Sequence, residues 1–247
     1  MIQLIHYGRP TAGPPLLALP GLDGTVGSIE PVVQRLAQER EVIVVDFSAE
    51  NNATLEQLVA EMATLLLREV PTPIDIMGQS IGTILAAQLA AWPGLTVRKV
   101  VLTCTFTRLR WTTLRWVAAL TRLTPNWLYR LTSPHTIALS CGPVGDGRDH
   151  PAFAASRNSN KQAVARRTTW QIDRDFSADL RKIHVPVMIL MGEKDRFVPD
   201  AAAECQKLRS LFAHHPAQIE TIANAGHIFL PSTAVATATT KIEAFLQ

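Results

Sequence analysis

Short apolar runs recur along the chain and alternate with helix-like stretches. The runs are rich in Val, Ile and Leu, and they read QLIHY, PLLALPG, EVIVVDF, IDIMG, KVVLTCT, VPVMILMG and AQIETIA. Most are continuously apolar, which is typical of strands in a parallel sheet that is covered on both faces. The helix-like stretches between them are 29–38, 55–69, 81–91, 201–211 and 233–246. This alternation predicts an α/β fold with a doubly wound, mostly parallel sheet.

The alternation is interrupted once, between residues 105 and 182, where no clear strand-like run occurs. A segment of this length is too long for a structureless loop in a compact domain. Its first part, RWTTLRWVAALTRLTPNWLYRL, has apolar residues at helical spacing and predicts two helices broken at Pro125. Its last part, NKQAVARRTTWQIDRDFSADLRKI, predicts one or two more helices. We therefore expect one domain, with an α/β core of residues 1–104 and 183–247 and an inserted helical cap of residues 105–182.

The composition favours a large buried core. Of the 247 residues, 47% are hydrophobic and 18% are charged, against roughly 25% charged in an average globular domain. The three cysteines, Cys104, Cys141 and Cys205, are widely spaced and match neither a disulfide framework nor a zinc site. The first residues lack the basic and apolar regions of a signal peptide. We therefore expect a cytoplasmic protein without a bound metal ion.

One stretch has the length of a membrane span, because residues 76–97 contain no charged side chain. Three glycines, two glutamines, Ser80 and Pro93 interrupt it, and its glycine-rich part separates a strand-like piece from a helix-like piece. We therefore expect no membrane partner. No recognised nucleic-acid-binding motif occurs, so we expect no nucleic-acid partner either.

Charge is distributed unevenly along the chain, whose net charge is +3. Residues 104–184 contain 13 Lys and Arg residues and 5 Asp and Glu residues, so this segment carries +8 and the rest of the chain carries −5. A basic cap could recruit an anionic partner, such as an acidic acyl-carrier protein. A solvated basic face explains the same charge, and the sequence leaves both interpretations open.

A serine occupies the junction between a strand-like run and a helix-like run. In IDIMGQSIGTILAAQLAA, Ser80 lies between Gly78 and Gly82. A sharp strand-to-helix turn requires small residues two positions before and after the serine. Such a turn would hold the hydroxyl clear of the sheet, at a helix N-terminus that favours nearby negative charge. Ser80 is therefore a candidate nucleophile, and the alternative is a serine that only caps the helix.

A serine nucleophile needs a histidine base and an acid that orients the base. His227 occurs in NAGHIFLP after the last strand-like run, and Asp195 follows the preceding run in VMILMGEKDRFVP. The C-terminal ends of parallel strands share one edge of the sheet, so these residues can converge on the serine. Asp46 and Asp200 are competing acids, although Asp46 precedes the serine and Asp200 is expected to begin a helix. The remaining histidines lack a comparable motif and are expected to be structural or exposed: His6, His135, His150, His184, His214 and His215.

These motifs resemble those of the α/β-hydrolase family. The resemblance covers nearly the whole chain, through the elbow GQSIG, the acid loop GEKDRFVP, the histidine loop AGHIFL and an insertion after VVLTCT, where the family commonly carries a cap. It implies that LPGLDGT, which contains Gly21, is the oxyanion loop, and that the N–H groups of Leu22 and Ile81 receive the developing negative charge. Pro20 stands where the family commonly has histidine, so the orientation of these donors is left open.

The resemblance also implies a reaction, namely acyl transfer to water by a serine triad that needs no cofactor. We expect a carboxylic ester hydrolase that acts on a small acyl substrate. A thioesterase, or a hydrolase of carrier-bound acyl esters recruited by the basic cap, is the alternative, because the family uses one triad for several leaving groups. A non-catalytic ligand-binding protein is the alternative from another class.

The cap offers a clue to the substrate because it holds four of the five tryptophans. They could line a hydrophobic acyl pocket or only dock the cap on the core, and they are Trp111, Trp116, Trp127 and Trp170. Cys104, at a strand end, could line the same pocket or be simply buried.

Overall fold

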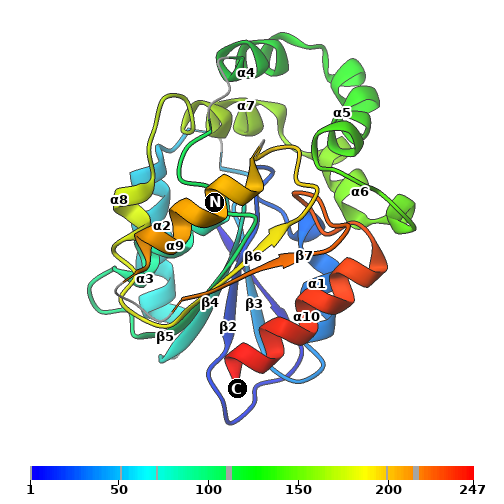
Figure 1. Cartoon of the computed structure of the whole chain (residues 1–247). Helices are drawn as coiled ribbons and strands as arrows, with labels where there is room; N and C mark the ends of the chain where they lie inside the picture. Colours follow the sequence, from blue (N-terminus) through cyan, green and yellow to red (C-terminus); the bar gives the residue numbers. More distant parts are fainter. Residues whose placement is uncertain (1, 51, 71, 110–112, 199, 214–216) are drawn as a thin grey trace.

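In the computed structural model, the described strands form one seven-stranded sheet in the order β1-β3-β2-β4-β5-β6-β7 (Figure 1). The structure describes all residues except 1, 51, 71, 110–112, 199 and 214–216. The strands are β1 (Gln3–Tyr7), β2 (Leu16–Leu19), β3 (Val42–Asp46), β4 (Ile74–Gln79), β5 (Val97–Thr103), β6 (Val187–Gly192) and β7 (Ala217–Ile222). Strand β1 pairs antiparallel with β3, and the other pairings are parallel.

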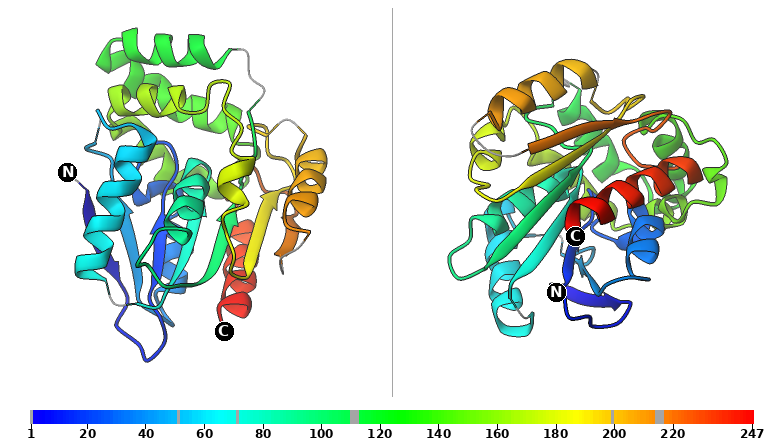
Figure 2. Two further views of the ribbon diagram at one scale, coloured as in Figure 1. Left: turned by 90° about the vertical axis from the view of Figure 1, so that its left-hand side faces the viewer. Right: turned by 60° about the horizontal axis from the view of Figure 1, so that its bottom comes forward.

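Helices cover both faces of the sheet, which explains the continuously apolar strands. Helices α2 (Leu55–Glu69), α3 (Ile81–Ala90) and α9 (Ala201–Leu211) contribute to one core cluster, and α1 (Glu30–Leu36) and α10 (Ser232–Leu246) contribute to the other (Figures 1 and 2). Alternate residues of β2 belong to different clusters, with Leu17 and Leu19 in the first and Leu16 and Ala18 in the second. The expected doubly wound α/β fold is therefore confirmed.

Local sequence signals set the helix boundaries. Thr54 and Gln57 begin α2 with a capping box, in which the Thr54 hydroxyl accepts the Gln57 N–H at 3.2 Å and the Gln57 side chain accepts the Thr54 N–H at 2.9 Å. Asn160 caps the helix α7 (Lys161–Thr169) by accepting two backbone N–H groups. Such caps satisfy N–H groups that have no partner inside the helix.

The segment between β5 and β6 is helical. It contains α4 (Leu114–Leu123), α5 (Asn126–Ser140), α6 (Pro151–Asn158), α7 and α8 (Ser177–Leu180), and a short 3-10 helix at Gly147–Asp149. Pro125 separates α4 from α5. Helix α4 packs on α7, and α5 packs on α6. Figures 1 and 2 show α4 to α7 above the edge of the sheet where the parallel strands end, whereas α8 lies beside the sheet and packs on α3.

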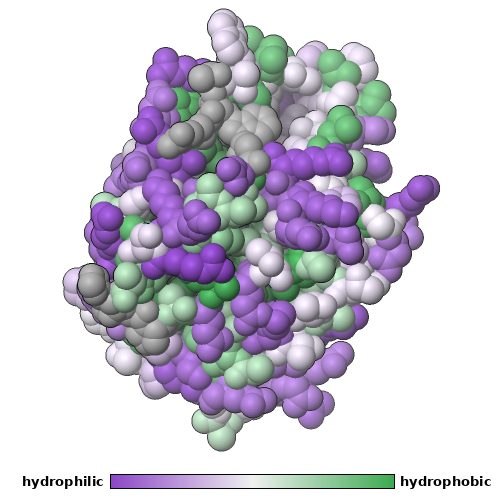
Figure 3. Space-filling model, viewed as in Figure 1, coloured by the Kyte–Doolittle hydropathy of each residue, from purple (hydrophilic) through white to green (hydrophobic). Residues whose placement is uncertain are grey.

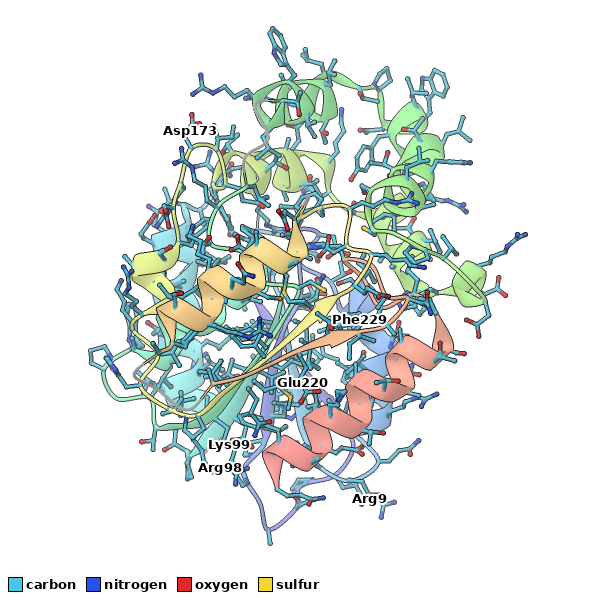
Figure 4. The ribbon with its side chains drawn as sticks, viewed as in Figure 1. Arg9, Arg98, Lys99, Asp173, Glu220 and Phe229 are labelled. Atoms are coloured by element: carbon cyan, nitrogen blue, oxygen red, sulfur yellow. The ribbon has the colours of Figure 1, made fainter. Side chains whose placement is uncertain are left out.

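The opposite edge of the sheet is tied together by charged groups. The carboxylate of Asp75, which is fully buried, accepts hydrogen bonds from the guanidinium groups of Arg40 and Arg98. Arg98 also donates to the carbonyl of Leu246, near the end of α10, and Lys99 donates to the carbonyl of Phe245. Figure 4 labels Arg98 and Lys99 at the end of the molecule away from the cap, so this cluster is structural.

No described helix has both the length and the hydropathy needed to cross a bilayer. Residues 76–90 of the uncharged stretch belong to β4, the elbow and α3, and most of them are buried in the core.

Candidate active site

Ser80 occupies a strained turn between β4 and α3. Its φ of 55° and ψ of −124° lie in a region that residues with a side chain rarely adopt. A Cβ atom on Gly78 would lie 2.4 Å from the Gly82 carbonyl oxygen, and one on Gly82 would lie 2.4 Å from the Leu19 carbonyl oxygen. The small residues on either side are therefore sterically required. Ser80 immediately precedes α3, all of whose residues are described, and its side chain makes no capping hydrogen bond to that helix. The hydroxyl is therefore available for another role.

The three predicted residues come together in two hydrogen bonds. His227 Nε2 lies 2.8 Å from Ser80 Oγ, and His227 Nδ1 lies 2.8 Å from Asp195 Oδ2. The second carboxylate oxygen of Asp195 accepts the N–H groups of Phe197 and Val198 at 2.7 and 3.0 Å. Because these bonds orient Asp195, its other oxygen favours a proton on Nδ1 and leaves Nε2 able to accept the proton of Ser80.

Parallel topology explains this convergence. Ser80 directly follows β4, Asp195 lies three residues after β6, and His227 lies five residues after β7. All three residues are buried, with 6%, 7% and 4% of their surface exposed. Burial places the hydrogen bond between His227 and Asp195 in a low-dielectric environment, which strengthens it.

The histidine loop also contacts the helical segment, which the sequence did not predict. The backbone N–H of His227 donates to the backbone carbonyl of Cys141, at the end of α5, at a distance of 2.5 Å. A Cβ atom on Gly226 would lie 1.6 Å from the same carbonyl oxygen. The glycine before His227 is therefore required for close approach of the two backbones.

The predicted oxyanion loop lies beside the serine. A Cβ atom on Gly21 would lie 3.6 Å from Ser80 Cβ and 2.4 Å from the side-chain oxygen of Gln79. The Gln79 amide in turn donates to the His227 carbonyl at 3.1 Å, so Gln79 lies beside the predicted oxyanion loop and bonds to the histidine loop. Ile81 is the first residue of α3, where the N–H has no carbonyl partner within the helix.

Arg167 holds the predicted oxyanion loop through hydrogen bonds, and these contacts could not be predicted from the sequence. This residue of α7 is only 1% exposed. One guanidinium nitrogen donates to the carbonyls of Leu22 at 3.0 Å and Asp23 at 2.9 Å. The other donates to the carbonyls of Phe47 and Glu50, and the guanidinium lies 4.7 Å from the centre of the Phe47 ring. Burial lowers the pKa of Arg167 to about 10, which leaves it charged at neutral pH.

The competing acids bond elsewhere. Asp46 accepts the N–H and hydroxyl of Ser48 at 2.9 and 2.6 Å. Asp200 caps α9 by accepting the Ala203 N–H at 2.9 Å, as its expected place at a helix start implies. Asp195 is the acid that contacts His227.

The other histidines have separate environments. His6 lies 2.9 Å from Glu41 on the surface, and His135 lies 3.2 Å from the Leu131 carbonyl. His150 is buried and accepts the Ala152 N–H at 3.1 Å, and burial lowers the pKa of His150 to about 4. His184 is exposed, and His214 and His215 lie outside the described residues.

Cys104 lies next to the Asp195 and His227 pair, and potential ligand atoms of the three residues are within 4.8 Å of one another. Burial, and then the charge of Asp195, raise the pKa of the Cys104 thiol well above its usual range, whereas a metal ligand must be a thiolate. Asp195 and both ring nitrogens of His227 are already hydrogen-bonded. This cluster therefore suits proton transfer better than metal binding. Cys104 also lines a cavity of about 20 Å³ beside His227.

Two of the three described tryptophans of the helical segment lie on its surface. Trp116 and Trp127 are 71% and 69% exposed, so neither lines a pocket under the cap nor docks the cap on the core. Trp170 is partly buried and packs against the main core cluster. Trp111 lies outside the described residues.

Known proteins share this architecture. Similar solved structures include a hydrolase from Oleispira antarctica, with a TM-score of 0.79 and 15% identity over 99% of this chain and 94% of that chain. A thermophilic esterase from Thermogutta terrifontis has a TM-score of 0.75 and 20% identity over 99% and 92% of the two chains. The enol-lactonase from Burkholderia xenovorans LB400 has a TM-score of 0.78 and 19% identity over 100% and 96%.

At these identities the solved structures establish a shared fold. No curated protein matches the chain in sequence at a significant level. The sequence model of the Alpha/beta hydrolase family does match, over residues 16–240, and it spans most of the chain. The chain therefore belongs to the alpha/beta hydrolase family.

Proposed function

We propose that the chain is a serine hydrolase that cleaves carboxylic esters through an acyl-enzyme on Ser80. The observation that carries this proposal is the pair of 2.8 Å contacts that link Ser80 to His227 and His227 to Asp195. A hydroxyl is a weak nucleophile until an adjacent base takes its proton, and this arrangement supplies the base and the group that orients it.

The steps follow from these positions. As Ser80 Oγ attacks the ester carbonyl carbon, His227 Nε2 takes the hydroxyl proton, and Asp195 stabilises the resulting imidazolium. The carbonyl oxygen becomes an oxyanion that accepts hydrogen bonds from the backbone N–H groups of Leu22 and Ile81. The C–O bond to the alcohol then breaks, and His227 gives its proton to the leaving oxygen. Water attacks the acyl-enzyme by the same sequence, which releases the acid and restores Ser80.

Two observations support the ester substrate and the absence of a cofactor. The similar structures include proteins whose names state that they are an esterase and an enol-lactonase, both of which act on a C–O bond next to a carbonyl. The steps above use only groups of this chain and water.

The three cysteines are free and buried, which supports a reducing compartment such as the cytoplasm.

A substrate panel with a serine variant tests the proposal. The wild type should hydrolyse short p-nitrophenyl esters, and a fluorophosphonate should label Ser80 alone. Ser80→Ala should remove turnover and labelling and leave the melting temperature nearly unchanged. Ser28→Ala is the matched control, because the Ser28 hydroxyl lies 3.4 Å from Gln79, and the described contacts give it no hydrogen bond to Ser80, Asp195 or His227.

The same panel separates the alternatives. Faster turnover of acyl-thioesters than of matched esters would identify a thioesterase, and a further gain with carrier-bound thioesters would identify an acidic acyl-carrier protein as partner. No turnover and no labelling of a folded protein would sink the hydrolase proposal and favour a non-catalytic binding protein.

A further inference from the structure

The outer side of α4 and α5 concentrates exposed apolar side chains. Among the described residues, the six most exposed large hydrophobic side chains lie on these two helices and are 61 to 78% exposed. We call these six the outer cap surface: Trp116, Leu120, Leu123, Trp127, Leu131 and Leu139. Figure 3 shows residues of high hydropathy over α4 and α5. Large exposed apolar patches mark interaction sites on most proteins.

Helix α4 has two apolar faces, and the larger one points away from the protein. Leu114 and Ala118 are buried. Trp116, Leu120 and Leu123 are exposed, and at about 100° per residue they lie roughly half a turn from the buried pair. The inner face packs on α7, and Figure 4 shows side chains of α4 projecting outward, away from the sheet. Packing within the chain therefore cannot bury both faces.

The charged residues of α4 and α5 themselves have a single sign. Arg115, Arg122 and Arg130 are exposed on α4 and α5, and no Asp or Glu occurs between residues 104 and 145. Arg115 pairs with Asp173, which follows α7, but both side chains are largely exposed, so this pair is weak. The outer cap surface is therefore apolar with a basic margin.

We propose that the outer cap surface binds the headgroup region of an anionic phospholipid bilayer, without crossing it. An amphipathic helix with Trp and Leu on its apolar face and Arg beside it is typical of surface-bound helices. Arginines near an anionic leaflet add electrostatic attraction. A second copy of this chain fits poorly, because a twofold interface would place the same arginines against each other. The expectation of no membrane partner rested on the lack of a span and did not address surface binding.

The proposal adds a place of action to the proposed function but does not depend on catalysis. The helices α4 to α7 lie over the sheet edge that carries Ser80 (Figure 1). A bilayer in contact with α4 would therefore face the same end of the molecule as the candidate active site. Because binding requires no turnover, Ser80→Ala should bind vesicles as the wild type does.

Vesicle cosedimentation tests the proposal, with phosphatidylcholine vesicles that either contain or lack phosphatidylserine. The wild type should bind the anionic vesicles, with a blue shift of its tryptophan fluorescence. The triple variant Trp116→Ser, Leu120→Ser, Leu123→Ser should reduce binding at least tenfold. Each of Arg115→Gln and Arg122→Gln should reduce it about fivefold, and raised salt should mimic them.

Matched controls lie on α2, far from this surface in the fold. Leu67 is 48% exposed, and the Arg68 side chain is 71% exposed, as is that of Arg115. Leu67→Ser and Arg68→Gln should leave vesicle binding unchanged. The α4 and α2 variants should hydrolyse dissolved p-nitrophenyl acetate at the wild-type rate, if the proposed function holds.

Three results would overturn the proposal. The first is no binding to anionic vesicles by a folded wild type, and the second is an equal loss of binding in the α2 controls. The third is that vesicles do not bind, whereas the outer cap surface mediates self-association or salt-sensitive binding to a purified acidic acyl-carrier protein. A wild type that binds vesicles but hydrolyses no ester would refute only the proposed function.

Discussion

Replacing Arg167 by methionine should uncouple the oxyanion loop from α7. Methionine has a flexible apolar side chain that fills part of the same space but donates no hydrogen bond. The substitution removes the guanidinium donors from the carbonyls of Leu22, Asp23, Phe47 and Glu50. Phe47 retains a second donor, the Glu50 N–H at 3.0 Å. The carbonyls of Leu22 and Asp23 therefore lose the donor that the structure gives them.

The structure sets the size of the expected effects. A buried acceptor left without a partner costs about 1–3 kcal/mol, and water that enters the opened loop offsets part of this cost. We therefore expect the free energy of unfolding to fall by about 3–4 kcal/mol, which for a chain of this size is a melting temperature lower by roughly 10 °C. Loss of one oxyanion donor costs about 10²–10³ in rate, so partial displacement of the Leu22 N–H should lower kcat by about tenfold to a hundredfold.

The assay is the turnover of a short p-nitrophenyl ester, measured well below the melting temperature of each variant. The kcat should fall and KM should change little, because the oxyanion contact forms in the transition state. Arg166→Met is the matched control. Arg166 is the preceding residue of α7, is exposed, and donates one hydrogen bond, to the Ala53 carbonyl at 3.0 Å. The Arg166→Met variant should retain nearly full activity and stability. Arg167→Lys keeps the charge with fewer donors and should fall between Arg167→Met and the wild type.

A fully folded Arg167→Met protein with wild-type kcat would refute the reasoning about the oxyanion loop and leave Arg167 as a stabilising residue. An equal loss of rate in Arg166→Met would refute it too, because the loss would then come from α7 as a whole.

Three further changes test the candidate site. Asp195→Asn should lower kcat by orders of magnitude, about 10⁴ in serine proteases, because the histidine takes the wrong tautomer. Asp200→Asn should lower kcat much less, and steady-state kinetics of the two variants test this difference. Gly226→Ala should strongly reduce both the melting temperature and the activity, because its Cβ would lie 1.6 Å from the Cys141 carbonyl oxygen, and a wild-type melt would contradict this. Burial lowers the pKa of His150 from 6.5 to about 4. As the pH drops from 6.5 to 4, His150 is therefore protonated in the unfolded chain but not in the folded one, and the free energy of unfolding falls by on the order of 2–3 kcal/mol in all. His150→Asn should lose less between pH 7 and pH 4.5 in thermal melts, and equal losses would show that other groups titrate.

The sheet and the convergence of Ser80, Asp195 and His227 could be predicted, because local sequence determines both. Continuous apolar runs form strands covered on both faces, and Gly78 and Gly82 mark a turn that admits only small residues. Asp195 and His227 each follow a strand-like run, and parallel pairing brings such positions to one edge. The distances among them follow from this topology, which the sequence pattern implies.

The contacts of the helical segment could not be predicted, because they depend on which side of each helix faces the core. Arg166 and Arg167 are adjacent and chemically identical, yet one is exposed and the other is 1% exposed. They differ by about 100° around α7, and only the packed position of α7 decides which of them reaches the oxyanion loop.

The same ambiguity explains why the sequence could not show that Trp116 and Trp127 are exposed. Helix α4 has apolar residues on two sides, so a pattern of spacing cannot say which side is buried. A rule that buries the larger side chains would place Trp116 inside, but in the structure the smaller pair, Leu114 and Ala118, packs inward. Exposed Trp and Leu side chains forgo the gain from burial, on the order of 25 cal/mol for each Å² of apolar surface. Helices α4 and α5 leave these side chains exposed and contain no Asp or Glu. Contact with an apolar and anionic partner explains both features better than packing within the chain does.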